Sequence, residues 1–124
     1  MIVSIGTDLV EHQTSEKLNW KNDVNTLKRI FSSEEIQLFL NEKCVKFLSG
    51  RFAAKEAILK CLFTGMEDGI SLTDIQILRL ANGKPIIKLS GKPLQLSQNL
   101  GIKKWHISLT HSPHFSQAFI IAES

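Results

Sequence analysis

The chain has 124 residues, 43% of them hydrophobic and 22% charged, and its 15 basic and 12 acidic side chains leave a formal charge of +3. This composition predicts one globular domain over residues 1–124 and excludes a disordered chain. No apolar stretch reaches the roughly 18 residues that cross a bilayer, so we expect no membrane partner and a cytoplasmic location. The small positive charge suits an anionic substrate or acidic partner but is too weak to indicate nucleic acid.

The N-terminal segment has the pattern of a buried strand. Residues 1–7 are apolar and rich in β-branched side chains, and Gly6 and Asp8 interrupt the run. We therefore expect Asp8 just past the end of the strand. Residues 9–21 are polar with scattered apolar positions, which predicts an irregular loop or a short helix.

Helical periodicity dominates the middle of the chain. Apolar residues recur every three or four positions between residues 24 and 31, as on one helix face. Ser32 is followed three positions later by Glu35, the spacing of a capping box, which predicts the start of another helix. Residues 41–63 have the longest helical pattern, and Gly50 inside it indicates either a helix break or the close approach of another group.

The last part of the chain predicts two hairpins separated by a short helix. Strand-like patterns occur in two pairs of segments, residues 74–80 with 86–89 and residues 105–110 with 115–123. Residues 82–85 have a turn sequence, and residues 94–100 predict a helix that ends at Gly101. This order of elements predicts an α+β fold in which an antiparallel sheet packs against a long helix.

Residues 51–60 hold the densest group of functional side chains. Glu56 and Lys60 are four positions apart and share a helix face, which is most often an ordinary surface ion pair. Asp8, by its position, is most often a turn residue. If Asp8 and Glu56 converge, however, they form an oxygen-only site that suits Mg²⁺, which typically takes one or two carboxylates together with phosphates and water.

Two other clusters indicate different chemistry. Histidines 106, 111 and 114 match no standard zinc spacing and have no cysteine near them. Residues 103–106 combine two lysines with a tryptophan and a histidine, as in a small basic module that binds nucleic acid. Because the net charge is only +3 and no RNA-binding motif is present, we expect no nucleic-acid partner and keep this function as an alternative.

Four motifs, in this order along the chain, resemble those of the 4′-phosphopantetheinyl transferase superfamily. They are Ile5-Gly6-Thr7-Asp8, the segment RFAAKEAILK at residues 51–60, Asn82-Gly83-Lys84-Pro85, and residues 106–112 with Ala118. Phe31 and Glu35 fit a further short match. The length of the chain is similar to that of the holo-acyl-carrier-protein synthase branch, whose members contain this unit once, and the resemblance implies the fold of that superfamily.

The resemblance implies a reaction and roles for several residues. Members transfer the 4′-phosphopantetheine group of coenzyme A to a serine of an apo acyl carrier protein, in lipid and fatty acid biosynthesis, and release 3′,5′-ADP. Asp8 and Glu56 would hold Mg²⁺ or Mn²⁺, and Lys60 would contact the phosphates and protonate the leaving group. Either Glu56 or a metal-bound water would be the base, and the sequence does not choose between them.

The resemblance also implies a coenzyme A site and an assembly. The residues expected to bind coenzyme A are Arg51, Lys55, Gly65, Gly83, Lys84, Pro85 and His111. The acyl carrier protein is the expected partner. The assembly would be a homotrimer with its sites between neighbouring subunits.

The chain departs from the family pattern at two places. Thr14 stands where members usually have an arginine, which affects the expected docking of the carrier protein. Phe63 stands where the loop that includes Gly65 usually begins with glycine. An inactive homologue that retains the fold is a further alternative. Neither departure affects Asp8 or Glu56.

Overall fold

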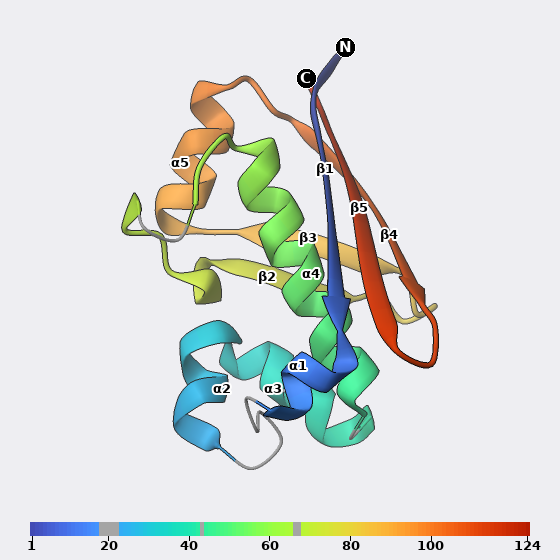
Figure 1. Cartoon of the computed structure of the whole chain (residues 1–124). Helices are drawn as coiled ribbons and strands as arrows, with labels where there is room; N and C mark the ends of the chain where they lie inside the picture. The colour runs from blue at the N-terminus through green and yellow to red at the C-terminus, as the bar shows by residue number, and fades with distance from the viewer. Residues whose placement is uncertain (18–22, 43, 66–67) are drawn as a thin grey trace.

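The computed structural model describes residues 1–17, 23–42, 44–65 and 68–124. Its helices are α1 (His12–Lys17), α2 (Val24–Ile30), α3 (Ser33–Glu42), α4 (Val45–Cys61) and α5 (Gly91–Asn99), with the 3-10 helix η2 (Leu72–Asp74). Its strands are β1 (Ile2–Glu11), β2 (Ile75–Arg79), β3 (Pro85–Leu89), β4 (Lys104–His111) and β5 (Phe115–Glu123). This mixture of helices and antiparallel strands confirms the predicted α+β class (Figure 1).

The larger sheet is antiparallel and has the order β1-β5-β4, and β2 pairs separately with β3. β1 pairs with β5 as far as Glu11, so Asp8 lies inside the strand, opposite Ala118. The prediction that Asp8 follows the end of the strand is therefore wrong. The strand continues past Asp8 because pairing with β5 keeps the following residues extended. α1 then begins at His12, within the segment predicted as loop or short helix.

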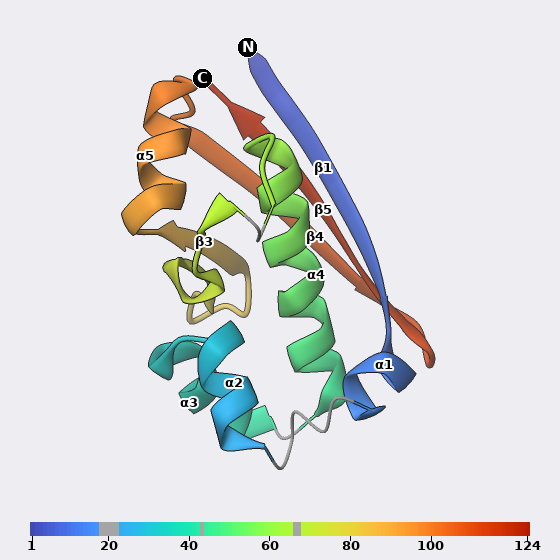
Figure 2. The same cartoon turned by 60° about the vertical axis from the view of Figure 1, so that its left-hand side comes forward.

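α4 lies against one face of the larger sheet, and the two figures show the β2–β3 hairpin beside the same helix (Figures 1 and 2). Small side chains allow the close packing, since Ala57 on α4 and Ala118 and Ala122 on β5 are fully buried. Gly6 of β1 is part of the same contact, because a Cβ atom there would lie 2.1 Å from the carbonyl oxygen of Ala57. Any larger residue at position 6 would therefore push β1 away from α4.

The predicted capping box is present at the start of α3. The Ser32 hydroxyl accepts a hydrogen bond from the Glu35 backbone N–H at 3.2 Å, and the Ser32 backbone N–H donates to Glu35 Oε1 at 3.0 Å. α3 continues to Glu42, and α4 begins at Val45, so the predicted helix 41–63 starts too early. Residue 43 lies outside the described residues. α2 and α3 lie near the N-terminal end of α4 (Figure 2).

α4 continues without a break through Gly50. A Cβ atom on Gly50 would lie 2.7 Å from Cε1 of the His111 ring, so the close approach of a side chain explains the glycine. α5 begins at Gly91, three residues earlier than predicted, and Pro93 falls in its first turn, where a backbone N–H is not needed. None of the described helices is long and apolar enough to span a bilayer.

Candidate active site

The first group of functional side chains lies between β1 and α4. Side chains alternate along β1, so Asp8 shares the inner face of Gly6 and points toward α4. Lys60 Nζ lies 3.3 Å from Asp8 Oδ1 and donates to the Thr7 carbonyl at 2.9 Å. The Asp8 side chain is 21% exposed and that of Lys60 56%, so this ion pair opens to solvent.

Glu56 lies one helical turn before Lys60 and therefore faces the same side of α4. Glu56 is half-buried, with its Oε1 atom buried, and its carboxyl and that of Asp8 are hard oxygen donors of the kind that Mg²⁺ takes. No cluster of three or more histidine, cysteine, aspartate or glutamate side chains suited to a metal occurs within the described residues. The donor set thus fits an ion that completes its shell with phosphate and water oxygens, and it does not fit a metal held entirely by protein.

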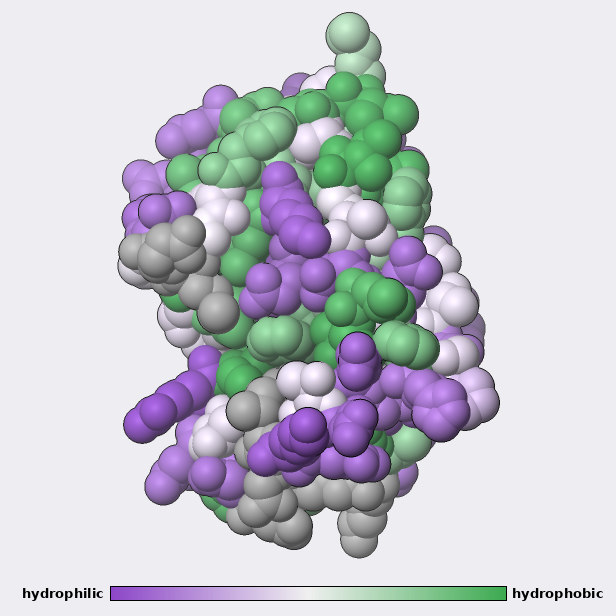
Figure 3. Space-filling model, viewed as in Figure 1, coloured by the Kyte–Doolittle hydropathy of each residue, from purple (hydrophilic) through white to green (hydrophobic). Residues whose placement is uncertain are grey.

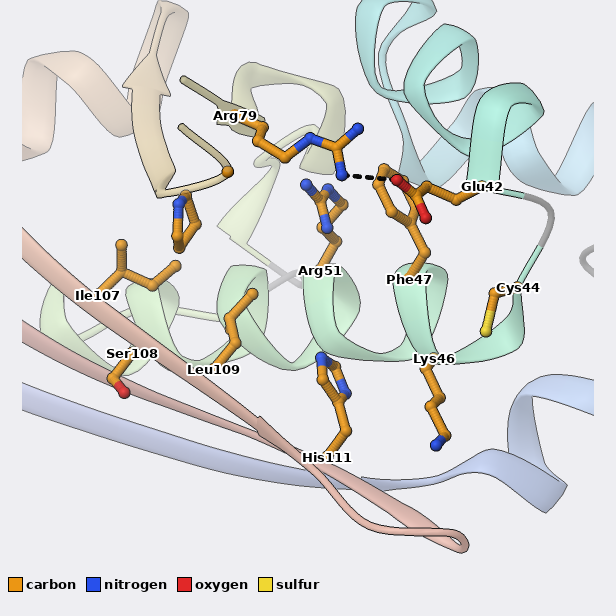
Figure 4. Close-up of a pocket in the computed structure, with 12 residues that line it drawn as sticks. Glu42, Cys44, Lys46, Phe47, Arg51, Arg79, Ile107, Ser108, Leu109 and His111 are labelled. Carbon is orange, nitrogen blue, oxygen red and sulfur yellow. Dashed lines mark hydrogen bonds and ion pairs between the residues drawn. The ribbon is translucent and has the colours of Figure 1, made fainter. Parts of the chain in front are cut away.

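The second group surrounds a cavity of about 500 Å³ (Figure 4). Four of the residues that line it are Arg51 of α4, Gly83 of the β2–β3 turn, Pro85 at the start of β3 and His111 at the end of β4. These four residues come from three separate motifs, and they are four of the seven residues expected to bind coenzyme A. The fold therefore brings distant motif residues around one space.

Arg51 is held in this cavity by two contacts, with Ile77 and with Phe47. Its Nε donates to the Ile77 carbonyl at 3.0 Å, and its guanidinium carbon lies 3.6 Å from the centroid of the Phe47 ring. Burial lowers the pKa of Arg51 to about 10, and the positive charge of Arg79 contributes in the same direction while Glu35 opposes it. Arg51 thus remains cationic at neutral pH and is held ready for an anion.

Sequence reasoning missed two other cations of the cavity, Lys46 and Arg79. Arg79 Nη1 pairs with Glu42 Oε1 at 2.7 Å, across the cavity edge (Figure 4). Lys46 precedes Gly50 by one turn of α4. A signal was present in the sequence, because Arg79 continues the inward alternation of the buried Ile75 and Ile77 at the end of β2.

Lys55 does not line this cavity. Its side chain is 0% exposed, and its ammonium donates to Glu35 Oε1 at 2.7 Å, to the Leu72 carbonyl at 2.9 Å and to the Ile75 carbonyl. Burial lowers the pKa of Lys55, and the Glu35 carboxylate opposes that shift. A direct contact between Lys55 and coenzyme A would require this packing to open, so its position indicates a role in holding α3, α4 and β2 together.

The remaining expected residues lie in two loops. Lys84 is exposed and lines a different cavity of about 440 Å³, together with Pro85 and with Trp105 of the basic segment. Gly65 follows α4, and its backbone N–H donates to Asp68 Oδ2 at 3.1 Å. Phe63 has φ of 57°, in the left-handed region that favours glycine.

The whole chain is similar to known proteins. The family model of the 4′-phosphopantetheinyl transferase superfamily matches residues 4–121. A holo-[acyl-carrier-protein] synthase of Hydrogenovibrio crunogenus is 44% identical over 100% of this chain and 98% of its own length, and one of Vibrio vulnificus is 39% identical over 99% and 98%.

Solved structures agree with these relatives. The crystal structure of holo-[acyl-carrier-protein] synthase from Neisseria meningitidis covers 100% of both chains with a TM-score of 0.88 and 34% identity. The Helicobacter pylori enzyme, solved in complex with coenzyme A, covers 97% of this chain and 100% of its own with a TM-score of 0.84 and 28% identity. The fold, the order of the motifs and these relatives agree, and the chain belongs to the 4′-phosphopantetheinyl transferase superfamily.

Proposed function

We propose that this chain is a holo-[acyl-carrier-protein] synthase, which transfers 4′-phosphopantetheine from coenzyme A to a serine of an apo acyl carrier protein and releases 3′,5′-ADP. The observation that carries the proposal is the cationic cavity lined by Arg51, Gly83, Pro85 and His111. The relatives that match the whole chain are named holo-[acyl-carrier-protein] synthases. A cavity with three cations and one carboxylate among its lining residues suits a ligand with several phosphates.

The reaction forms one phosphorus–oxygen bond and breaks another. The serine oxygen bonds to the phosphorus that carries the pantetheine arm, and the bond from that phosphorus to the 3′,5′-ADP oxygen breaks. We assign Lys60 to the developing charge and the protonation of the leaving oxygen, because its ammonium is half exposed beside Asp8. Within this chain, Glu56 is the candidate base for the serine proton.

Asp8 and Glu56 would hold Mg²⁺, and Mn²⁺ is an alternative with the same oxygen ligands. When bound, the ion would neutralise charge on the diphosphate of coenzyme A and orient it. The support for this assignment is the hard donor set of the two carboxylates. Lys60, which pairs with Asp8 in the structure, would then be available to turn its ammonium toward phosphate oxygens.

Intact-mass spectrometry of an apo carrier protein tests the activity and its metal dependence. Carrier mass should rise by one phosphopantetheine with coenzyme A and Mg²⁺, and excess chelator should stop the transfer. Asp8→Ala and Glu56→Ala should each lose at least about 100-fold in turnover, because the ion and the phosphate orientation are lost together. Glu34→Ala, an exposed carboxylate on α3, is the matched control and should retain full turnover. Near-normal turnover of either site variant would refute its assignment.

We also propose that residues 1–124 act as one domain and assemble as a homotrimer through the outer face of the larger sheet. Ile5, Leu9 and Phe119 on that face are 55%, 58% and 43% exposed, an apolar surface that favours association. Apolar surface also gathers in the upper part of the view in Figure 3, around the start of β1. Light scattering should give three times the 14.0 kDa mass of one chain, and a monomer at micromolar concentration would reject the proposal.

A further inference from the structure

A series of hydrogen bonds through the buried His12 and Ser116 connects α1 to the cavity. His12 Nδ1 lies 3.1 Å from the Pro113 carbonyl oxygen, and His12 Nε2 lies 2.8 Å from Ser116 Oγ. Ser116 Oγ in turn lies 2.7 Å from His111 Nδ1. His12 is 7% exposed and Ser116 is 0% exposed, so solvent does not compete for the contact between these two side chains. The proposed reaction assigns no role to His12 or Ser116.

When His12 is neutral, the carbonyl at one end of the series fixes the direction of every hydrogen bond in it. A carbonyl oxygen only accepts, so His12 Nδ1 must carry a hydrogen and donate it to Pro113. In neutral His12, Nε2 is then an acceptor, and the Ser116 hydroxyl donates to it. The Ser116 oxygen is left to accept from His111 Nδ1–H. Neutral His111 consequently has its lone pair on Nε2.

The His111 ring is also held in place from the other side. Its Cε1 atom fills the space that a side chain at position 50 would take, and Figure 4 shows the ring extending from β4 to α4 below Arg51. With Nδ1 bonded to Ser116, Nε2 is the ring nitrogen left for a ligand in the cavity. Lys46 and Arg51 line the same cavity, which makes that ligand an anion.

We infer that His12 and Ser116 are positioning residues, which fix the Nδ1–H tautomer of His111 and present its Nε2 to a phosphate oxygen of the bound ligand. The identity of that ligand as coenzyme A rests on the proposed function, whereas the tautomer does not. Because a lone pair on Nε2 repels an anion, the proton that His111 takes from solvent on binding goes to Nε2. The groups facing the ring are His12 on α1, Ser116 on β5, and Lys46 and Arg51 on α4.

Nitrogen-15 NMR of the intact protein tests the tautomer without any assay of activity. At about pH 7.5, where an unperturbed histidine is mostly neutral, His111 should show a protonated Nδ1 and an unprotonated Nε2. In Ser116→Ala, the signals should change to the other tautomer or to an average of both. A wild-type His111 protonated on Nε2 at this pH, or an unchanged tautomer in Ser116→Ala, would overturn the inference.

Steady-state kinetics with two variants of His12 test the positioning role. His12→Leu removes both hydrogen bonds and should raise KM for coenzyme A roughly tenfold while changing kcat by less than about twofold. His12→Gln retains an acceptor for the Ser116 hydroxyl and should restore most of the loss. Equal KM values for wild type and His12→Leu would overturn the role of His12. If the wild-type protein shows no transfer at all, the proposed function fails, and the NMR result still decides the tautomer.

Discussion

The buried ion pair between Lys55 and Glu35 allows a quantitative prediction about stability. Lys55→Met retains the apolar stem of the side chain but removes the ammonium, leaving the Glu35 carboxylate buried at 0% exposure. Removing one partner of a buried pair costs about 3–5 kcal/mol. Glu35 retains two N–H donors, from Ser32 and Ile77, which places the cost of its charge near the lower end of that range.

Two carbonyl groups add to this cost. The Leu72 and Ile75 carbonyls also lose the ammonium as donor, at about 1 kcal/mol each if they stay dry, so the total is about 5 kcal/mol. A domain of this size has a free energy of unfolding of about 5–15 kcal/mol, so the loss is a large part of it. With a slope near 2 kcal/mol per molar urea, the unfolding midpoint should fall by about 2.5 M.

Urea unfolding followed by circular dichroism measures this change. Lys88→Met, on the exposed side of β3, is the matched control and should move the midpoint by less than about 0.3 M. Because the pair is buried, raising the salt concentration should not reduce the difference. The double variant with Glu35→Leu should lose less than the sum of the two single variants. A loss below about 1 kcal/mol in Lys55→Met would refute the reasoning that this ion pair holds three elements together.

Three further predictions concern a helix end, a histidine and the carrier. Phe63→Gly should raise the free energy of unfolding by about 0.5–1 kcal/mol. Phe63 has φ of 57° and is 72% exposed, so the substitution relieves backbone strain and removes little packing. An unchanged urea midpoint would contradict this. Burial, with the charges of His12, Lys46 and Arg51, lowers the pKa of His111 below 6.5, so the unfolded chain binds its proton first. Stability from this group is therefore complete above about pH 6.5 and lost as the pH falls through the folded pKa, and His111→Gln should show a shallower fall in urea midpoint between about pH 7 and 5. Thr14→Arg, on the exposed side of α1, should lower KM for an acidic carrier at low salt with no change in KM for coenzyme A, and equal carrier constants would place the docking surface elsewhere.

Local patterns predicted most of the elements, because their causes are local. The capping box of Ser32 and Glu35 and the turn at Gly83, where φ is 88°, both have the geometry that their residue types favour. The extension of β1 beyond Asp8 was missed, because pairing with a strand more than 100 positions later decides it. Periodicity alone could not separate α3 from α4 either, because the sequence on both sides of residue 43 is helical: α3 ends at Glu42 and α4 begins at Val45.

The candidate site shows the same division between local and distant information. The sequence indicated that Glu56 and Lys60 share a helix face, and the proximity of Asp8 to Lys60 required the packing of β1 on α4. The sequence could not tell which cations of residues 51–60 point inward. Arg51 lines the cavity, whereas Lys55 pairs with the buried carboxylate of Glu35, although both lie in one motif.

The order of strands in the larger sheet has a consequence for the synthesis of the protein. β1 emerges from the ribosome first, yet its partner in the sheet, β5, emerges more than 100 residues later. Until then Asp8 has no fixed position beside Lys60, and the apolar side chains of β1 have an unpaired edge next to them. The nascent chain therefore cannot assemble its carboxylate site gradually. Catalytic competence should appear in a single late step, and a chain stalled before β5 should be both inactive and prone to aggregation.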